Sequence, residues 1–214
     1  MRVALTFDAE HPDRPGCPPG VHDRVLEALA PETPATFFLQ GRWAQAYPDA
    51  ARRIADAGHV IGSHSHFHAR FPLLTDEGLR ADITQAHRAI REATGVDPRP
   101  LFRCPWGHGA RDPRVALALR RQRYVHVGWD VVAQDWEPSR TAARVAEDVV
   151  RGAAAFGDGA VLLLHSWSIS ALEALPTILG RLRESEARFV TVAELADRDL
   201  TTTANPDTAS ENPA

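Results

Sequence analysis

Short apolar runs alternate with longer amphipathic stretches along almost the whole chain. Each apolar run is bounded by Gly, Pro or a charged residue, which is typical of buried parallel strands. The runs predict seven strands, at residues 2–7, 35–39, 59–63, 101–103, 124–128, 160–165 and 188–192. Stretches with apolar residues at helical spacing predict helices at residues 21–29, 48–58, 75–93, 112–122, 139–155 and 171–184. This alternation predicts an α/β fold with a mostly parallel sheet, open or closed into a barrel.

Length and composition fit one soluble domain. The chain has 214 residues, of which 44% are hydrophobic and 24% charged, and these proportions exclude a collagen, a coiled coil and an intrinsically disordered chain. Residues 199–214 carry few apolar side chains and are rich in Thr, Ala, Asn and Pro. We therefore predict a disordered tail there and a single folded domain over residues 1–198.

Charge and apolar content exclude several kinds of partner. The 24 basic residues, all of them Arg, are scattered and accompany 28 acidic residues, so the net charge is −4 and we expect neither nucleic acid nor a membrane as partner. No run approaches the ~20 apolar residues that span a bilayer, and no signal peptide is seen, which predicts a cytoplasmic location. Cys17 and Cys104 cannot build a disulfide framework; we expect two free thiols, and pairing between them stays open.

Histidine is concentrated in one segment. Residues 59–68 read HVIGSHSHFH and hold four of the ten histidines, directly after a predicted strand. His64 and His68 would lie on the same side of a helical turn, which is a metal-chelating spacing, whereas on a strand His64 and His66 would share a face. The cluster favours a metal site over surface histidines. A catalytic zinc site needs three protein ligands and an open position, so a carboxylate must come from elsewhere in the chain.

Carboxylates follow the first predicted strand. In TFDAE, Asp8 and Glu10 point to the same face of an extended segment, so they can serve one site, although acids at strand ends are also common as turn residues. In FRCPWG (residues 102–107), Arg103 is suited to orienting a carboxylate, and Trp106 offers a flat apolar wall.

Two further segments supply an acid–base candidate. His165 closes the strand in LLLHS, and Asp135 lies in AQDW. A single histidine that ends an apolar strand is usually a core residue, but with Asp135 to orient it an acid–base role becomes competitive.

These segments together resemble a known family. The ordered set TFDAE, SHSHFH, RCPWG, QDW and LLLHS is similar to the five motifs of the polysaccharide deacetylase family, the NodB-homology domain, also called carbohydrate esterase family four. The resemblance covers residues 2–197, and RFVTVAEL resembles the closing strand and helix of that family. It implies a distorted (β/α)7-type barrel with parallel strands, outer helices and a metal site at the C-terminal ends of the strands.

The resemblance also implies a role for each motif. Asp8 corresponds to the general base, which Arg103 would orient. His165 corresponds to the general acid, which Asp135 would hold. The implied metal ligands are His64 and His68, and the implied substrate-binding residues are Trp106, with a nearby backbone N–H for the oxyanion, and Trp136 and Leu163, which would line the pocket for the acyl methyl group.

One position departs from the family. Many members carry two adjacent Asp residues in the first motif, and the second is a metal ligand, but here that position is Ala9. We expect Glu10 to be the third ligand, as in relatives with an Asp-x-Asp or Asp-x-Glu arrangement. The alternatives are His11 or a site with two histidines only. We expect zinc, with cobalt, nickel or manganese as the other metals to consider.

The sequence therefore predicts a hydrolase of carbon–nitrogen bonds. A metal-activated water would remove an N-acyl group, in the first instance acetyl, from an amino sugar or related amide carried by a small molecule or an oligosaccharide. The alternatives are a deformylase or small-amide hydrolase of the same fold, and a non-catalytic sugar-binding relative, for which Ala9 is the only support. A glycosidase built on Asp8 and Glu10 is disfavoured, because acids two residues apart seldom straddle a glycosidic bond. The oligomeric state stays open.

Overall fold

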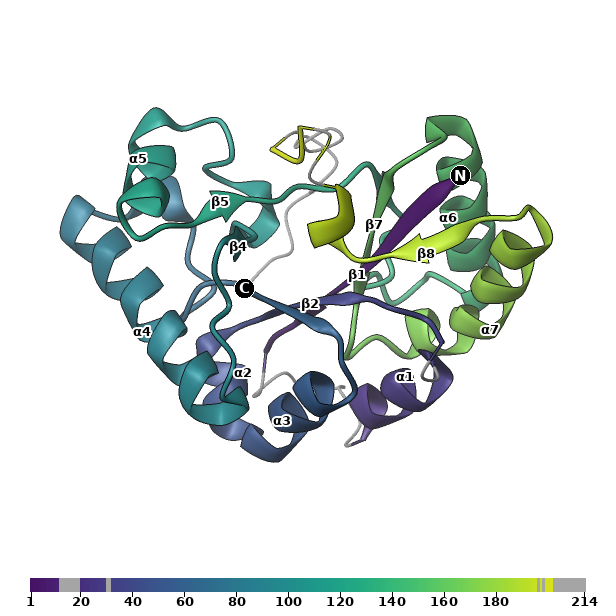
Figure 1. The fold of residues 1–214 in the computed structure, drawn as a ribbon, viewed down its shortest axis with the longest axis horizontal. Helices are drawn as coiled ribbons and strands as arrows, with labels where there is room; N and C mark the ends of the chain where they lie inside the picture. Colours follow the sequence, from purple (N-terminus) through teal and green to yellow (C-terminus); the bar gives the residue numbers. More distant parts are fainter. Residues whose placement is uncertain (12–19, 30–31, 196, 198, 202–214) are drawn as a thin grey trace.

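Eight parallel strands form a curled sheet, and helices cover its outer side (Figure 1). The computed structural model describes residues 1–11, 20–29, 32–195, 197 and 199–201. The strands are β1 (Arg2–Ala9), β2 (Thr36–Leu39), β3 (Val60–Ser63), β4 (Leu101–Phe102), β5 (Val125–His126), β6 (Val131–Val132), β7 (Ala160–His165) and β8 (Arg188–Val190). The sheet order is β5-β4-β3-β2-β1-β7-β6, and β8 pairs with the first residues of β1. No ladder joins β5 to β6 within the described residues, so the barrel is open between them.

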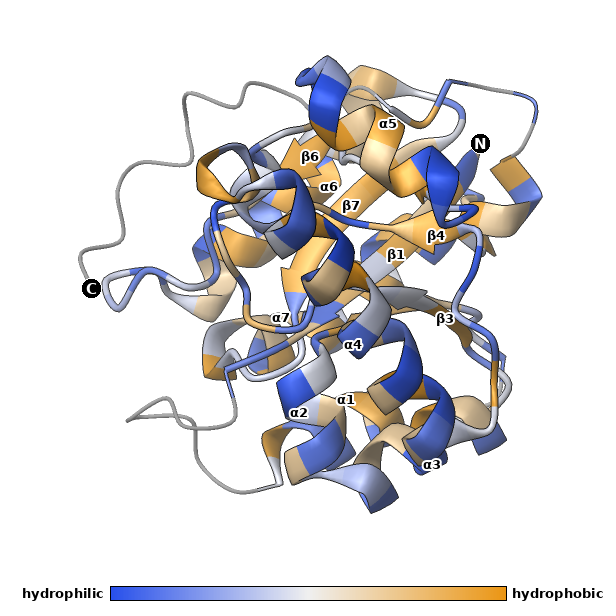
Figure 2. Cartoon of the chain, turned by 90° about the vertical axis from the view of Figure 1, so that its left-hand side faces the viewer, coloured by the Kyte–Doolittle hydropathy of each residue, from blue (hydrophilic) through white to orange (hydrophobic). Residues whose placement is uncertain are grey.

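The helices form an arc around the outer face of the sheet. They are α1 (Val21–Leu29), α2 (Gly41–Ala46), α3 (Pro48–Asp56), α4 (Asp76–Thr94), α5 (Pro113–Arg121), α6 (Ala142–Phe156) and α7 (Ile169–Glu184), with short 3-10 turns η1 (Phe71–Leu73), η2 (Pro105–Gly107) and η3 (Val192–Leu195). On α3 and α4, which face the viewer in Figure 2, hydrophilic residues lie on the outer side, and the buried residues of the long helices are mostly apolar. The helices are therefore amphipathic covers of a buried sheet, as the spacing predicts.

Strand β1 shows how the two faces of the sheet differ. Val3, Leu5 and Phe7 belong to an outer apolar cluster with residues of α1, α3, α6 and α7. Ala4 belongs to a smaller cluster inside the barrel, with residues of β2, β4 and β7. Since side chains alternate along a strand, Thr6 and Asp8 follow Ala4 on the inward face, and Asp8 lies at the C-terminal end of β1.

The predicted fold class is confirmed, and two elements were missed. All seven predicted strands and six predicted helices are present within a few residues of their predicted ends. Strand β6 has two residues, as β4 and β5 do, and was not predicted. Helix α2 has six residues, and Gln40 before it makes no side-chain cap, so no N-terminal signal marks its start.

Several sequence predictions fall partly outside the described chain. Cys104 is buried, and burial raises the pKa of its thiol, whereas Cys17 lies outside the described residues. Residues 202–214 of the predicted tail are likewise outside, and Leu200 still packs against the inner cluster. Among the helices that the structure describes, none is long and apolar enough to cross a bilayer.

Candidate active site

The two acidic residues at the end of β1 face the inside of the half-barrel. Asp8 and Glu10 are each only 3% exposed. Ala9 lies between them and belongs to the outer apolar cluster beneath the helices. A carboxylate at position 9 would enter that apolar layer, so Glu10 is the residue that brings a second carboxylate to the inner face.

His64 and His68 meet beside Glu10. The Nε2 atoms of His64 and His68 lie 3.0 and 2.6 Å from Glu10 Oε2, and 3.1 Å from each other. The chain between the two histidines is not helical. Ser65 and His68 both have left-handed backbones, with φ of 63° and 57°, and Ser65 Oγ accepts the His68 N–H at 2.9 Å. The four-residue spacing thus brings the rings together through a tight loop and not through a helical turn.

The groups around these rings suit a bound cation. His64 Nδ1 donates to the Arg103 carbonyl oxygen at 2.9 Å, which leaves Nε2 to face Glu10. Burial works against protonation of His64, but Asp8 and Glu10 outweigh burial and raise its pKa, so this position favours positive charge. Glu10 Oε2 is buried and has no well-aligned donor among the described residues. Burial works against ionisation of Glu10, yet the neighbouring His68 and His11 hold its pKa well below the ordinary value. Glu10 is therefore a buried carboxylate whose charge needs a positive partner, which a protonated imidazole or a bound metal ion supplies.

A divalent metal fits this arrangement. Burial also lowers the pKa of His68, against the opposing effect of Glu10, which favours the neutral ring that a metal binds. The ligand atoms lie 2.6–3.1 Å apart. Ligands at about 2.0–2.2 Å from one tetrahedral metal would be separated by ~3.3–3.6 Å, so the three ligand atoms would have to move apart by under ~1 Å. We call Glu10, His64 and His68 the ligand cluster.

Asp8 is held by a fully buried arginine. Nη1 of Arg103 donates to Asp8 Oδ1 at 2.8 Å and to Thr6 Oγ1 at 2.9 Å, and its other nitrogens donate to two backbone carbonyls that follow β5. The guanidinium also lies 4.1 Å from the centre of the Phe38 ring. The second oxygen of Asp8, Oδ2, is 3.6 Å from His64 Nε2 and so faces the ligand cluster.

His165 is held by a carboxylate, whereas Asp8 is held by a cation. It ends β7, and its Nδ1 donates to Asp135 Oδ1 at 2.9 Å, while Asp135 Oδ2 accepts the His165 backbone N–H at 2.8 Å. Burial disfavours the charged ring, but the Asp135 carboxylate outweighs burial, with help from Glu10 and Asp8, and raises the pKa of His165 to about 9. The other ring nitrogen, Nε2, is 3.7 Å from Glu10 Oε1.

The three expected substrate-binding residues lie around this centre. The Trp136 ring meets His165 edge-on, with 5.3 Å between ring centres, and packs against the inner cluster that contains Leu163. The Trp106 ring lies 4.2 Å from that of His68, and its backbone is left-handed, with φ of 52°. Trp136 and Leu163 therefore belong to the side of His165, and Trp106 to the side of His68.

Sequence reasoning missed Asp82, which supports the histidine loop. Asp82 is 3% exposed on α4 and accepts the backbone N–H groups of His66 and Phe67 at 2.8 and 3.0 Å. Its position in the sequence held a signal: with Leu79 and Ile83 it lies on the apolar stripe of the helix, where an acid needs a buried partner.

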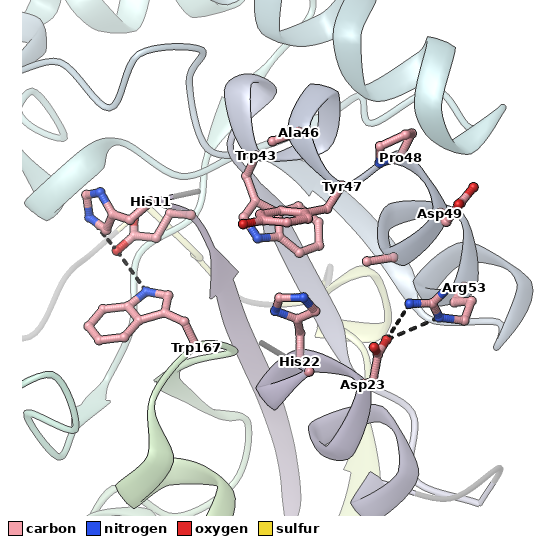
Figure 3. Close-up of a pocket in the computed structure, with 13 residues that line it drawn as sticks. His11, His22, Asp23, Trp43, Ala46, Tyr47, Pro48, Asp49, Arg53 and Trp167 are labelled. Atoms are coloured by element: carbon pink, nitrogen blue, oxygen red, sulfur yellow. Dashed lines mark hydrogen bonds and ion pairs between the residues drawn. The ribbon is translucent and has the colours of Figure 1, made fainter. Parts of the chain in front are cut away.

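The contact of Trp167 with Glu10 was also not predicted, and His11 was only an alternative ligand. The Trp167 indole N–H donates to Glu10 Oε1 at 3.4 Å, a bond drawn dashed in Figure 3, and His11 Nε2 lies 3.0 Å from the same oxygen. Strand alternation from His165 would have placed Trp167 on the same face. Both residues line a cavity of about 450 Å³ that extends to Tyr47 and is bounded by α1, α2 and α3.

Comparison with known proteins shows the family of the chain. The polysaccharide deacetylase family model matches residues 1–126. The peptidoglycan-N-acetylglucosamine deacetylase of Bacillus cereus is 30% identical over 198 residues, which cover 90% of this chain and 67% of that protein. The peptidoglycan-N-acetylglucosamine deacetylase PgdA of Listeria monocytogenes is 30% identical over 206 residues, 93% of this chain but only 40% of PgdA.

A solved structure shows the same fold. The family 4 carbohydrate esterase from Streptomyces lividans, in complex with acetate, superposes with a TM-score of 0.75 at 29% identity, covering 87% of this chain and 90% of that one. The family model spans more than half of the 214 residues. The chain therefore belongs to the polysaccharide deacetylase family, and the prediction of a deacetylase-type hydrolase is confirmed at the level of that family.

Proposed function

We propose that the protein is a zinc-dependent N-deacetylase that hydrolyses the acetamido group of an amino sugar. One observation carries the proposal: a carboxylate and an imidazole, suited to accept and to donate a proton, flank the ligand cluster. Asp8 Oδ2 is 3.6 Å from His64 Nε2, and His165 Nε2 is 3.7 Å from Glu10 Oε1. An amide at the cluster would have a base on one side and an acid on the other.

Two pairs of residues each perform one proton transfer: Asp8 with Arg103, and His165 with Asp135. A divalent metal bound by the ligand cluster would lower the pKa of its water toward ~7 and polarise the amide carbonyl. Asp8, which Arg103 keeps aimed at the cluster, accepts the proton of the attacking water. His165, protonated below a pKa of about 9, donates its Nε2 proton to the departing nitrogen, because an amide nitrogen leaves poorly as an anion. Asp135 fixes the ring through Nδ1 for this transfer.

The acyl group and the oxyanion have separate contacts in this proposal. Trp136 and Leu163 supply apolar surface for the acetyl methyl group beside His165. A backbone N–H near Trp106 donates to the oxyanion of the tetrahedral intermediate, as in other acyl-transfer sites.

The proposed substrate is an N-acetylhexosamine within an oligosaccharide. Several curated relatives are named as peptidoglycan-N-acetylglucosamine or peptidoglycan-N-acetylmuramic acid deacetylases, which supports an amino sugar. The cavity beside His11 and Trp167 gives room for a neighbouring sugar. Formyl sugars and small amides need the same groups and remain the second substrate class. The cytoplasmic location stays a prediction of the sequence.

The test is release of primary amine from N-acetyl and N-formyl sugars, chito-oligosaccharides, peptidoglycan fragments and small amides, each with and without a strong chelator. We expect turnover of an N-acetylhexosamine that the chelator abolishes and added zinc restores. Faster release from formyl sugars or small amides would replace the substrate class and keep the mechanism. Sugar binding without turnover, with zinc or cobalt present, would contradict the proposed deacetylase activity and favour a sugar-binding protein.

A further inference from the structure

The two oxygens of Glu10 have different surroundings. Oε2 faces the rings of His64 and His68 at 3.0 and 2.6 Å. Oε1 faces the opposite group, with His11 Nε2 at 3.0 Å and the Trp167 indole N–H at 3.4 Å (Figure 3). One oxygen of Glu10 is thus directed at the two histidine ligands, while His11 and Trp167 hold the other.

A glutamate at this position needs such support. It has one more rotatable bond than the aspartate that supplies a carboxylate in many members of the family, so its carboxylate samples more orientations when nothing holds it. A metal ligand that must be ordered on binding lowers metal affinity, and groups that hold the ligand in place restore it.

The chain at His11 is shaped to bring its ring back over Glu10. His11 has a left-handed backbone, with φ of 55°, a conformation that is uncommon outside Gly but that His, Asn and Asp adopt more often than other residues. Gln40, itself 3% exposed, fixes the turn: its Oε1 accepts the His11 N–H at 2.9 Å, and its own N–H donates to the Ala9 carbonyl at 2.9 Å. The His11 ring then packs edge-on against His68, with 4.6 Å between ring centres.

We propose that His11 is a positioning residue for the metal site: its Nε2–H holds Glu10 Oε1, with Trp167 as a second donor, so that Oε2 faces the two histidines. This inference rests on the proposed function, because it requires Glu10 to be a metal ligand. It also explains why a left-handed turn directly follows the ligand, since the turn places the donor.

The test is metal affinity, measured by competition with a chromophoric chelator for zinc, together with the visible spectrum of the cobalt-loaded protein. For His11→Ala we expect about 10–100-fold weaker zinc binding, the size typical of groups that orient a ligand, with cobalt bands at unchanged positions. His11→Asn is the matched backbone control. Asn tolerates the left-handed turn but is too short to reach Glu10, so this variant should lose as much zinc affinity as His11→Ala. His11→Gln places an N–H at the reach of Nε2 and should recover most of the affinity.

A Trp167→Phe variant tests the second hydrogen-bond donor separately. Trp167→Phe keeps an aromatic ring and removes the indole N–H, so we expect a loss smaller than that of His11→Ala, since the 3.4 Å bond is long.

Three results distinguish failure of the positioning role of His11 from failure of the proposed metal centre. Zinc affinity of His11→Ala within about threefold of the wild type would overturn the positioning role. A loss as complete as that of His64→Ala, with shifted cobalt bands, would make His11 a ligand itself and also overturn it. Unchanged zinc binding in Glu10→Gln and His64→Ala would instead refute the metal centre of the proposed function.

Discussion

The base side and the acid side of the site follow the same plan with the charges exchanged. On the base side a buried cation, Arg103, holds the carboxylate of Asp8. On the acid side a buried carboxylate, Asp135, holds the imidazole of His165. Each holding residue also bonds to the backbone: Arg103 donates to the Gly128 carbonyl, and Asp135 accepts the backbone N–H of His165 itself.

The two sides differ in which partner can change its charge. Burial lowers the pKa of Arg103, but an arginine begins so high that it keeps its proton. On the acid side the imidazole itself titrates, with a pKa of about 9. The base side is therefore a permanent ion pair whose loss affects folding, whereas the acid side is a tuned group whose loss affects rate and its pH dependence.

Removing the permanent cation should have the largest effect. Arg103→Met leaves Asp8 as an unpaired carboxylate in a buried site, which costs about 3–5 kcal/mol of unfolding free energy, and it also leaves the base without orientation. Urea unfolding measures the first effect and amine release the second. Adding Asp8→Asn removes the unpaired charge, so the double variant should regain much of the stability while staying inactive. An Arg103→Met protein as stable as the wild type would contradict this account of the base side.

On the acid side the effect should fall on rate with metal retained. His165→Ala should lower kcat roughly 10²–10⁴-fold, the contribution typical of a general acid, without loss of zinc. His64→Ala is the matched histidine variant within the ligand cluster and should lose the metal. Metal analysis and amine release on the same preparations distinguish the two roles, and equal metal loss in both variants would contradict the division.

Asp135→Asn should move the pH dependence without removing the acid. The wild-type imidazole has a raised pKa, so it is charged below about 9 and loses its proton above it. Without the carboxylate, burial prevails, and the pKa should fall by about 1–3 units, the usual effect of one opposite charge at contact. Histidine NMR titration of the metal-free protein reads this pKa directly. The alkaline limb of kcat/KM for the zinc-loaded enzyme should move to lower pH in the same variant, and an unmoved limb would remove His165 as the titrating acid.

The sequence predicted the strand-end positions of the site well, because they follow from local patterns. Asp8 and His165 each close an apolar run, and the ends of neighbouring parallel strands meet at one edge of the sheet. Alternation along β1 also supports Glu10, since a residue two places after Asp8 shares its face.

The supporting residues depend on contacts that no local pattern contains. His11 reaches Glu10 from a left-handed turn whose N–H is held by Gln40, 29 residues away in the sequence. The loop between His64 and His68 has no periodicity, so its non-helical shape was not predictable. Asp82 acts across 16 residues on the N–H of His66. Such long-range hydrogen bonds decide how rigid the site is.

The smallest expected effect concerns acyl size, and it also distinguishes the two sides. Leu163→Ala should enlarge the apolar space beside His165. The variant should raise the kcat/KM for N-propionyl relative to N-acetyl substrate by roughly 10-fold, since one methylene in an apolar pocket contributes at least that much. Val161→Ala is the matched control, because Val161 lies two residues earlier on the same face of β7 and in the same cluster. Both variants lose core packing, but only Leu163→Ala should change the ratio. A variant on the base side, such as Asp8→Asn, should slow both substrates equally, so a ratio that shifts there as well would show that the acyl group does not lie on the acid side.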